Sequence, residues 1–226
     1  MERSSYMLPV AVGCSYNRCT FCTLFKHLRY RPLPIEQVEQ ELKRVSAAGG
    51  NPVQIFLGDG NAFGMETDHL LHILELIHRY FPGCRMVNMD ATVTNISQKS
   101  DKELRLLYDQ GVRRLYLGIE SGLEDVLSFT KKDHNLQQAY CQIERMKNAG
   151  MIFNAHIMTG IAGAGRGTEN AQQTALFFNR TQPERIINFS LFLNRRAPLF
   201  RDYQAGRFTP ASELENLMED RLLVSL

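Results

Sequence analysis

The stretch "YMLPVAVGCSYNRCTFC" (residues 6–22) joins a short apolar segment to three of the five cysteines in the chain. The apolar part is typical of a buried strand, with residues 9–12 at its centre. Cys14, Cys19 and Cys22 follow at C-x4-C-x2-C spacing. We therefore look in the rest of the chain for other strands that are followed by a loop with reactive or ligand-binding residues.

The same strand-then-loop pattern recurs, and each time a helical segment follows it. Hydrophobic spacing, glycines and prolines predict six strand–helix units, with strands at 9–12, 53–58, 85–90, 113–120, 151–160 and 185–193 and helices at 35–48, 66–81, 100–110, 135–149, 169–179 and 212–224. Ser100 with Glu103 forms a capping-box pattern at the start of one helix. Such alternation predicts an α/β fold with a parallel sheet, and both a doubly wound sheet and a partial β/α barrel satisfy it.

Composition narrows the class of protein. The chain has 226 residues, of which 44% are hydrophobic, and a formal net charge of +2, which suits one domain or two small ones. We find no signal-peptide layout, no apolar run of membrane-spanning length and no charge that requires nucleic acid. We therefore expect a soluble, cytoplasmic protein. An odd number of cysteines there favours metal binding or catalysis over disulfides.

Three neighbouring thiols make a soft site that suits zinc or an iron–sulfur cluster. Structural zinc needs four ligands, and His27 is the one candidate nearby, without a second C-x2-C pair. A [4Fe–4S] cluster held by three cysteines leaves one iron for a chelating substrate. Glycine-rich stretches at the ends of the other strands, "GDGNAFG", "GIESG" and "GIAGAGRG", let backbone N–H groups approach a ligand.

With its aromatic residue before the last cysteine, "GCSYNRCTFC" resembles the cluster motif of the radical S-adenosylmethionine (radical SAM) superfamily, in a branch with one residue more than the common C-x3-C-x2-C. Later segments resemble the family in order: "FLGDGNAF", "LYLGIESGLEDVLSFTKKD", "GIAGAGRGTENAQQTA" and "PERIINFSLFL". The resemblance implies a partial (β/α)6 barrel with parallel strands and a [4Fe–4S] cluster on Cys14, Cys19 and Cys22. S-adenosylmethionine would chelate the free iron and be cleaved reductively, and a 5′-deoxyadenosyl radical would abstract hydrogen from a substrate.

Further residues are candidates for contacts with S-adenosylmethionine. Phe21 and the Gly160–Ile161 pair suit the adenine, and Gly58, Asp59 and Gly60 suit the amino group. Glu120 suits the ribose hydroxyls or the amino group, although it alternatively caps a turn, and Ser121 suits the same ribose. By resemblance, Asn88 is a ribose ligand, and Lys132 (or its neighbour Lys131) faces the cofactor carboxylate, as a basic residue does in oxygen-independent coproporphyrinogen oxidase.

Other residues have two interpretations each. His156, on an apolar strand, faces the substrate or is a hydrogen-bonded core histidine. The basic run "KHLRYR" (26–31) is a solvated surface, or it meets an anionic substrate or a reductant such as flavodoxin or ferredoxin. Cys84 and Cys141 lack cluster spacing, and we expect Cys141 to pack inside a helix as a small apolar residue.

The leading hypothesis is a radical SAM enzyme, an oxidoreductase-type protein, whose core domain spans residues 1–226 and whose C-terminal extension is absent or naturally short. Two alternatives are a non-catalytic iron–sulfur electron carrier and a zinc-stapled β/α binding protein. The first requires a fourth protein ligand, and the second requires zinc without iron or sulfide.

Overall fold

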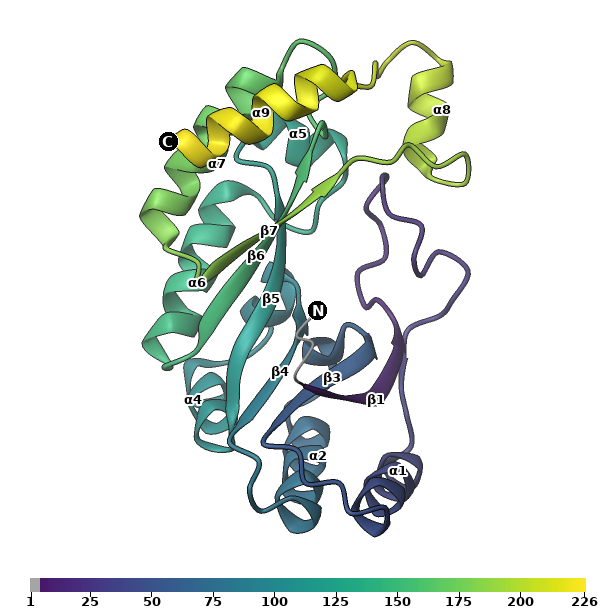
Figure 1. Ribbon diagram of the computed structural model, residues 1–226, viewed down its shortest axis with the longest axis vertical. Coiled ribbons are helices and arrows are strands. Elements are labelled where there is room, and N and C mark those ends of the chain that lie inside the picture. Colours follow the sequence, from purple (N-terminus) through teal and green to yellow (C-terminus); the bar gives the residue numbers. More distant parts are fainter. Residues whose placement is uncertain (1–4) are drawn as a thin grey trace. The chain divides into compact units, whose positions relative to one another are not determined.

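A computed structural model of the protein describes residues 5–226 and contains the predicted alternation of strands and helices (Figure 1). All six strand–helix units are confirmed, with boundaries within a few residues of those expected. They are β1 (Tyr6–Gly13) with α1 (Ile35–Ala47), β3 (Gln54–Gly60) with α2 (Thr67–Tyr80), β4 (Met86–Ala91) with α4 (Asp101–Asp109), β5 (Val112–Glu120) with α6 (Leu136–Asn148), β6 (Ile152–Thr159) with α7 (Gly167–Thr181), and β7 (Arg185–Ser190) with α9 (Glu213–Ser225).

The strands form a sheet in the order β2-β1-β3-β4-β5-β6-β7. β1 pairs in parallel with β3, β3 with β4, and β6 with β7. The two-residue strand β2 (Arg31–Pro32) runs antiparallel to β1. In a parallel sheet the carboxyl ends of the strands and their loops share one edge, which is where functional residues collect.

Four short elements lie outside the predicted set. They are η1 (Ala62–Gly64), α3 (Val93–Ser97), α5 (Glu124–Phe129) and α8 (Pro198–Gln204). Each spans two turns or less, too short for hydrophobic periodicity to reveal. All four follow the carboxyl end of a strand, so they belong to the loops that carry the candidate site.

The chain divides into two compact units. The first comprises residues up to Ser15, His27–Tyr116 and Arg145–Phe153, and the second comprises Tyr16–Lys26, Leu117–Glu144 and Asn154–Leu226. In the first unit, β1, β3 and β4 carry fully buried aliphatic side chains, against which the apolar faces of α1 and α2 pack. The predicted capping box is present, because Ser100 Oγ accepts from Glu103 N while the Glu103 carboxylate accepts from Ser100 N.

In the second unit, α9 packs against α7. Unlike a common amphipathic helix, it directs polar side chains inward and apolar side chains outward. Two of its acidic side chains, Glu219 and Asp220, face inward: Glu219 is buried and accepts hydrogen bonds from Gly160 N and Asn170 Nδ2. Asp220 accepts from Thr159 Oγ1 and Asn188 Nδ2. The large apolar side chains of α9 are exposed instead: Leu214, Leu217, Met218 and Val224.

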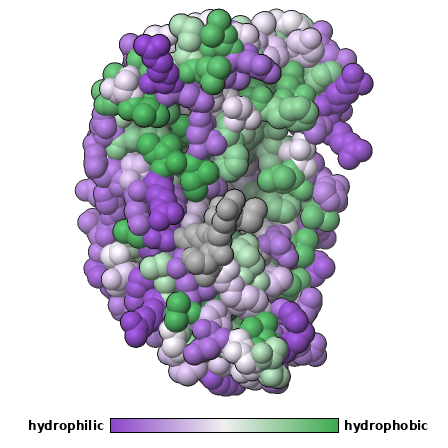
Figure 2. All heavy atoms as spheres, in the orientation of Figure 1, coloured by the Kyte–Doolittle hydropathy of each residue, from purple (hydrophilic) through white to green (hydrophobic). Residues whose placement is uncertain are grey.

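Apolar side chains gather over α9 and β7 on the face shown in Figure 2. α9 is therefore attached to the second unit by polar contacts rather than by an apolar stripe, contrary to the common rule for amphipathic helices. Within residues 5–226, none of the helices combines the length and apolar character that crossing a membrane requires.

Candidate functional site

Cys14, in the first unit, directly follows the end of β1, where the backbone of β3 approaches closely. The Gly13 carbonyl accepts a hydrogen bond from Asn61 N at 3.0 Å. A Cβ atom on Gly60 would lie 2.5 Å from the same carbonyl oxygen, so only glycine fits. The predicted Gly58–Asp59–Gly60 segment thus lies beside the residue that precedes the first cysteine.

Two further contacts hold the start of the cysteine loop, by which we mean residues 14–22, and neither was predicted. Ser15 Oγ accepts from Asn95 Nδ2 at 3.2 Å, and Asn95 is itself fixed by a capping box with Thr92 at the start of α3. Tyr30 Oη donates to the Asn61 carbonyl at 3.2 Å. Thr92 is a common N-cap residue, but Asn95 stands where the capping-box pattern has Glu or Gln, so the sequence signal covered only the N-cap.

Asn88 and Asp90 lie on β4, and their spacing places both on one face of that strand. Asn88 is completely buried, and burial raises the pKa of Asp90 to about 6. Asp59, at the end of β3, has an exposed side chain that is open to a ligand.

In the second unit, the cysteine loop is attached to the segment that carries Lys132. Tyr16 Oη donates to the carbonyl oxygens of Lys131 at 2.7 Å and Lys132 at 3.1 Å. Thr20 N and Thr20 Oγ1 both donate to the Thr130 carbonyl, at 2.9 and 3.3 Å. We call these four hydrogen bonds the loop staple. It fixes the backbone on both sides of Cys19 relative to Lys132.

Lys132 is paired with two carboxylates in the interior. Its Nζ lies 3.2 Å from Glu120 Oε1 and 3.5 Å from Asp133 Oδ1, and the three side chains are 6%, 10% and 0% exposed. Asp133 also contacts His134 Nδ1 at 3.1 Å. The two carboxylates raise the pKa of Lys132 despite burial, which works in the opposite direction. Lys132 therefore remains charged, and Glu120 and Lys132, both predicted, lie together.

The Cys19 thiol shares this environment. Burial raises its pKa to about 11; Lys132 lowers it, while Glu120 and Asp133 raise it. At neutral pH the side chain is a protonated thiol, and a soft metal that binds it has to displace the proton.

Phe21 and Ile161 also meet in the second unit. Leu123, Val126 and Ile161 form a buried cluster, and Phe21 packs against it. This contact brings the cysteine loop and the glycine-rich loop after β6 together around an apolar surface that suits a planar ring.

Ser121 and Gly160 already take part in internal hydrogen bonds. Ser121 is fully buried, and its Oγ donates to Asn170 Oδ1 at 2.5 Å and accepts from Leu123 N at 3.0 Å. Gly160 N donates to Glu219 Oε2 at 3.1 Å. Asn170 and Glu219 were not predicted, because nothing in a helical pattern distinguishes a polar residue that faces inward.

His156 lies on β6 with its ring edge-to-face against Phe189, at a centroid separation of 5.4 Å. Burial, together with the charge of Lys132, lowers its pKa to about 4. The imidazole is therefore neutral at pH 7.

Backbone strain concentrates in these loops. The described part of the chain has five residues other than glycine with positive φ, and four of them are Asn17, Asp59, Glu120 and Lys131. This conformation costs about 1–3 kcal/mol per residue and persists where the surroundings enforce it, often at functional sites.

The sulfur donors suit an iron–sulfur cluster by their chemistry. All five cysteines are free, and Cys14, Cys19 and Cys22 are half-buried. Among residues 5–226, no three His, Cys, Asp or Glu side chains are already gathered around a metal position. The short loop itself keeps the three sulfur atoms within reach of one cluster. Cys141 lies in α6 but is exposed, so the expectation that it packs as an apolar residue was wrong.

Comparison with known proteins decides the family. The sequence model of the Radical SAM superfamily matches residues 8–171. This chain belongs to the radical SAM superfamily. The family implies a [4Fe–4S] cluster and S-adenosylmethionine, to which the three thiols and the paired charges beside Cys19 are chemically suited.

Curated relatives of this radical SAM chain are distant. It is 24% identical over 205 residues to the heme chaperone HemW of Bacillus subtilis (strain 168), an alignment that covers 87% of this chain and 53% of the relative. It is 22% identical over 222 residues to the ribosomal protein uS12 methylthiotransferase RimO of Desulforamulus reducens, covering 95% and 46%. The chain thus spans about half the length of these relatives.

Solved structures confirm the radical SAM fold. The coproporphyrinogen III oxidase HemN from Escherichia coli, a radical SAM enzyme, matches with a TM-score of 0.70 and 14% identity over 98% of this chain and 50% of that chain. Methylornithine synthase (PylB) matches with a TM-score of 0.67 and 15% identity over 97% and 62%. The predicted α/β fold of the partial-barrel type is therefore confirmed.

Proposed function

We propose that this protein is a radical SAM enzyme that binds a [4Fe–4S] cluster through Cys14, Cys19 and Cys22. When bound, the cluster would supply the electron for reductive cleavage of S-adenosylmethionine, and this chemistry would serve to abstract a hydrogen atom from the substrate. The support for this is family membership over residues 8–171 together with the C-x4-C-x2-C loop.

The single observation that carries the proposal is the buried pair of Glu120 and Lys132 beside Cys19. A cofactor with both a carboxylate and an ammonium group needs one charge of each sign near the cluster. Lys132 is suited to the carboxylate. Glu120 is suited to the ammonium group or the ribose hydroxyls. The loop staple fixes both the cysteine loop and the Lys132 backbone before any ligand binds.

We propose roles for the remaining candidates from the chemistry of their side chains and backbone. Phe21 and Ile161 provide the apolar surface for the adenine. The amino group would be contacted by Gly58, Asp59 and Gly60, and the ribose by Asn88. The internal hydrogen bonds of Ser121 and Gly160 hold the neighbouring loops in place. His156, neutral at pH 7, is the low-priority candidate for a substrate contact.

We further propose a radical SAM core over residues 1–226, a cytoplasmic location, and a reductant such as flavodoxin or ferredoxin. The basic run at 26–31 suits the acidic surface of such a carrier. Among the relatives, HemW is named for heme and RimO for methylthiolation of a ribosomal protein. Such different names leave the substrate of this chain to be identified by experiment.

The test is anaerobic reconstitution with iron and sulfide, followed by dithionite and S-adenosylmethionine. We expect 5′-deoxyadenosine from the unaltered protein and none from Cys19→Ala. The matched control is Cys141→Ser, which alters an exposed cysteine and should leave iron content and product unchanged. One equivalent of zinc with no iron or sulfide in anaerobically purified protein would overturn the proposal in favour of a zinc-stapled protein. A cluster spectrum unaffected by S-adenosylmethionine would indicate an electron carrier.

A further inference from the structure

The second unit contains a cavity of about 460 Å³, and Ile161 is the one residue of its lining that has a role above. Three segments surround it: α5, the glycine-rich loop 160–166, and the segment 207–209 before α9. The Ala164 N–H donates to the Thr209 carbonyl at 2.8 Å and joins two of these segments. The volume lies within the range of about 300–1,000 Å³ found for small-molecule sites.

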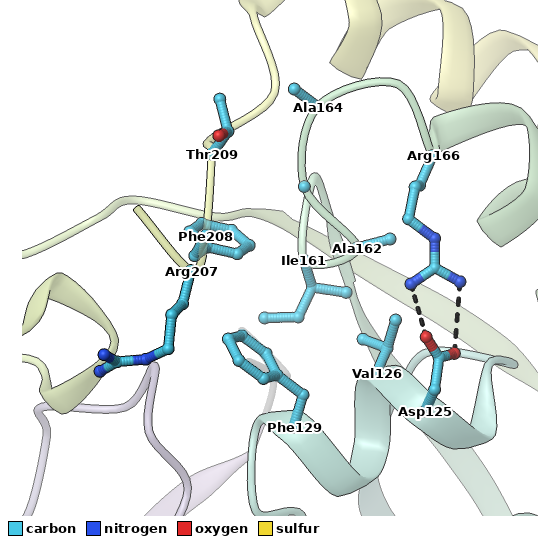
Figure 3. A pocket seen from close by; sticks show the side chains of 11 residues that line it. Asp125, Val126, Phe129, Ile161, Ala162, Ala164, Arg166, Arg207, Phe208 and Thr209 are labelled. Atoms are coloured by element: carbon cyan, nitrogen blue, oxygen red, sulfur yellow. Dashed lines mark hydrogen bonds and ion pairs between the residues drawn. The ribbon is translucent and has the colours of Figure 1, made fainter. Parts of the chain in front are cut away.

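The walls of the cavity are aromatic and aliphatic. The rings of Phe129 and Phe208 stack with a centroid separation of 6.2 Å and an interplanar angle of 22°. Val126, Ile161 and Ala162 line the adjoining wall. In Figure 3, Phe129 and Phe208 lie to the left of Val126 and Ala162, and the Ile161 side chain points toward the two rings. Such surfaces favour a flat ring, which stacks on one wall and excludes water from the other.

The charged side chains at the rim have partners of their own. Arg166 pairs with Asp125 at 2.6 Å and Glu169 at 2.9 Å. Arg207 pairs with Asp202 at 2.6 Å, and its guanidinium points away from the cavity in Figure 3. A charged ring placed between these apolar walls would lose hydration there, and carboxylates already balance the charges of both rim arginines. The cavity therefore selects an uncharged ring.

The cavity adjoins the candidate cofactor contacts. Val126 and Ile161, which line it, belong to the cluster against which Phe21 of the cysteine loop packs. A ligand in the cavity would touch these same two side chains. We infer that the cavity receives a planar, uncharged aromatic part of the substrate and holds it next to the cofactor. This inference rests on the proposed function and adds a substrate class to it.

The test uses indole as an uncharged probe and indole-3-acetate as its anionic match, with binding to the full chain measured by calorimetry. We expect indole to bind at least fivefold more tightly than indole-3-acetate. Phe129→Ala should weaken indole binding about threefold to tenfold, the effect of one lost aromatic pair. Phe192→Ala, which removes an exposed ring outside the cavity, should leave it unchanged.

A second variant guards against loss of folding in Phe129→Ala. Ala164 lines the cavity and is exposed, so Ala164→Phe adds a side chain to the cavity without displacing buried side chains. This variant should also abolish indole binding. No measurable indole binding at millimolar concentration, or equal loss in Phe192→Ala, would overturn the inference.

Saturating S-adenosylmethionine separates a substrate site from an adenine site. We expect the affinity of the reconstituted protein for indole to change less than twofold when the cofactor is added. Competitive displacement would assign the cavity to the adenine and overturn the inference. Cys19→Ala should lose 5′-deoxyadenosine formation yet retain indole binding, so failure of the proposed function is distinguishable from failure of the cavity assignment.

Discussion

Lys132→Met should destabilise the metal-free protein far more than Glu120→Gln, although both changes break the same ion pair. Lys132 is the only cation within 4 Å of Glu120 among the described residues, and it also lies 3.5 Å from Asp133. Its removal leaves two buried carboxylates without that charge. Breaking a buried pair by removing one partner costs about 3–5 kcal/mol, and we expect a loss in that range.

Glu120→Gln has a smaller expected effect because the remaining charge keeps a partner. Lys132 retains Asp133, whose side chain is completely buried, and the glutamine oxygen still accepts a hydrogen bond. We expect a loss of about 1.5 kcal/mol, the size of a weakened charge-assisted hydrogen bond. The predicted ratio between the two variants is therefore at least about two.

The assay is urea unfolding of the metal-free proteins, followed by circular dichroism, with the slope of each transition compared. The matched control is Lys131→Met, which alters the exposed neighbouring lysine and should change stability by less than about 0.5 kcal/mol. Equal losses in Lys131→Met and Lys132→Met, or a larger loss in Glu120→Gln than in Lys132→Met, would refute the reasoning.

Three further predictions concern packing within the second unit. Glu219→Ala should lower the free energy of unfolding in urea by about 2–3 kcal/mol, because two buried donors lose their acceptor. Leu217→Ala, which shortens an exposed side chain, should leave it almost unchanged. The opposite order would show that the apolar side of α9 is the side that packs against the unit. His156 has a lowered pKa, so the unfolded chain binds its proton first, and stability should fall as pH falls from about 6.5 to 4, by up to about 1.4 kcal/mol per pH unit; His156→Gln should flatten this part of the profile, and an unchanged profile would contradict the burial of the neutral ring. Gly122→Ala places a Cβ 2.4 Å from the backbone of α7 and should cost about 3 kcal/mol, whereas Gly83→Ala, with its nearest atom at 3.5 Å, should be nearly neutral, and equal thermal midpoints for the two would disprove the clash.

The sequence was sufficient to predict the long elements, because periodicity and terminal signals agreed there. Ser100 and Glu103 predicted a capping box that is present, and Gly111 follows that helix with φ of +102°. Hydrophobic periodicity did not reveal the short helices, because one or two turns contain too few residues to show a period, and only the family resemblance of "LYLGIESGLEDVLSFTKKD" implied a helix where α5 lies. α5 is the important case, since it supplies one wall of the cavity.

Part of the candidate site was also predictable, because cysteine spacing and strand-end position are local properties. Glu120 and Lys132, twelve residues apart, lie together in one ion pair. The partners of Ser121 and Gly160 were not predictable. Asn170 and Glu219 are more than 45 residues away in sequence, and a polar residue on a helix normally faces solvent. Contacts of this kind depend on how elements pack, which local patterns do not contain.

The loop staple has a consequence for the order of events during synthesis. Tyr16 and Thr20 leave the ribosome early, yet their partners at 130–132 are made more than 100 residues later. At about 5–20 residues per second, the cysteine segment waits on the order of 5–20 seconds before it acquires these anchors. During that interval the loop staple cannot form, so Cys19 acquires its fixed backbone position relative to Lys132 only after the middle of the chain has been translated.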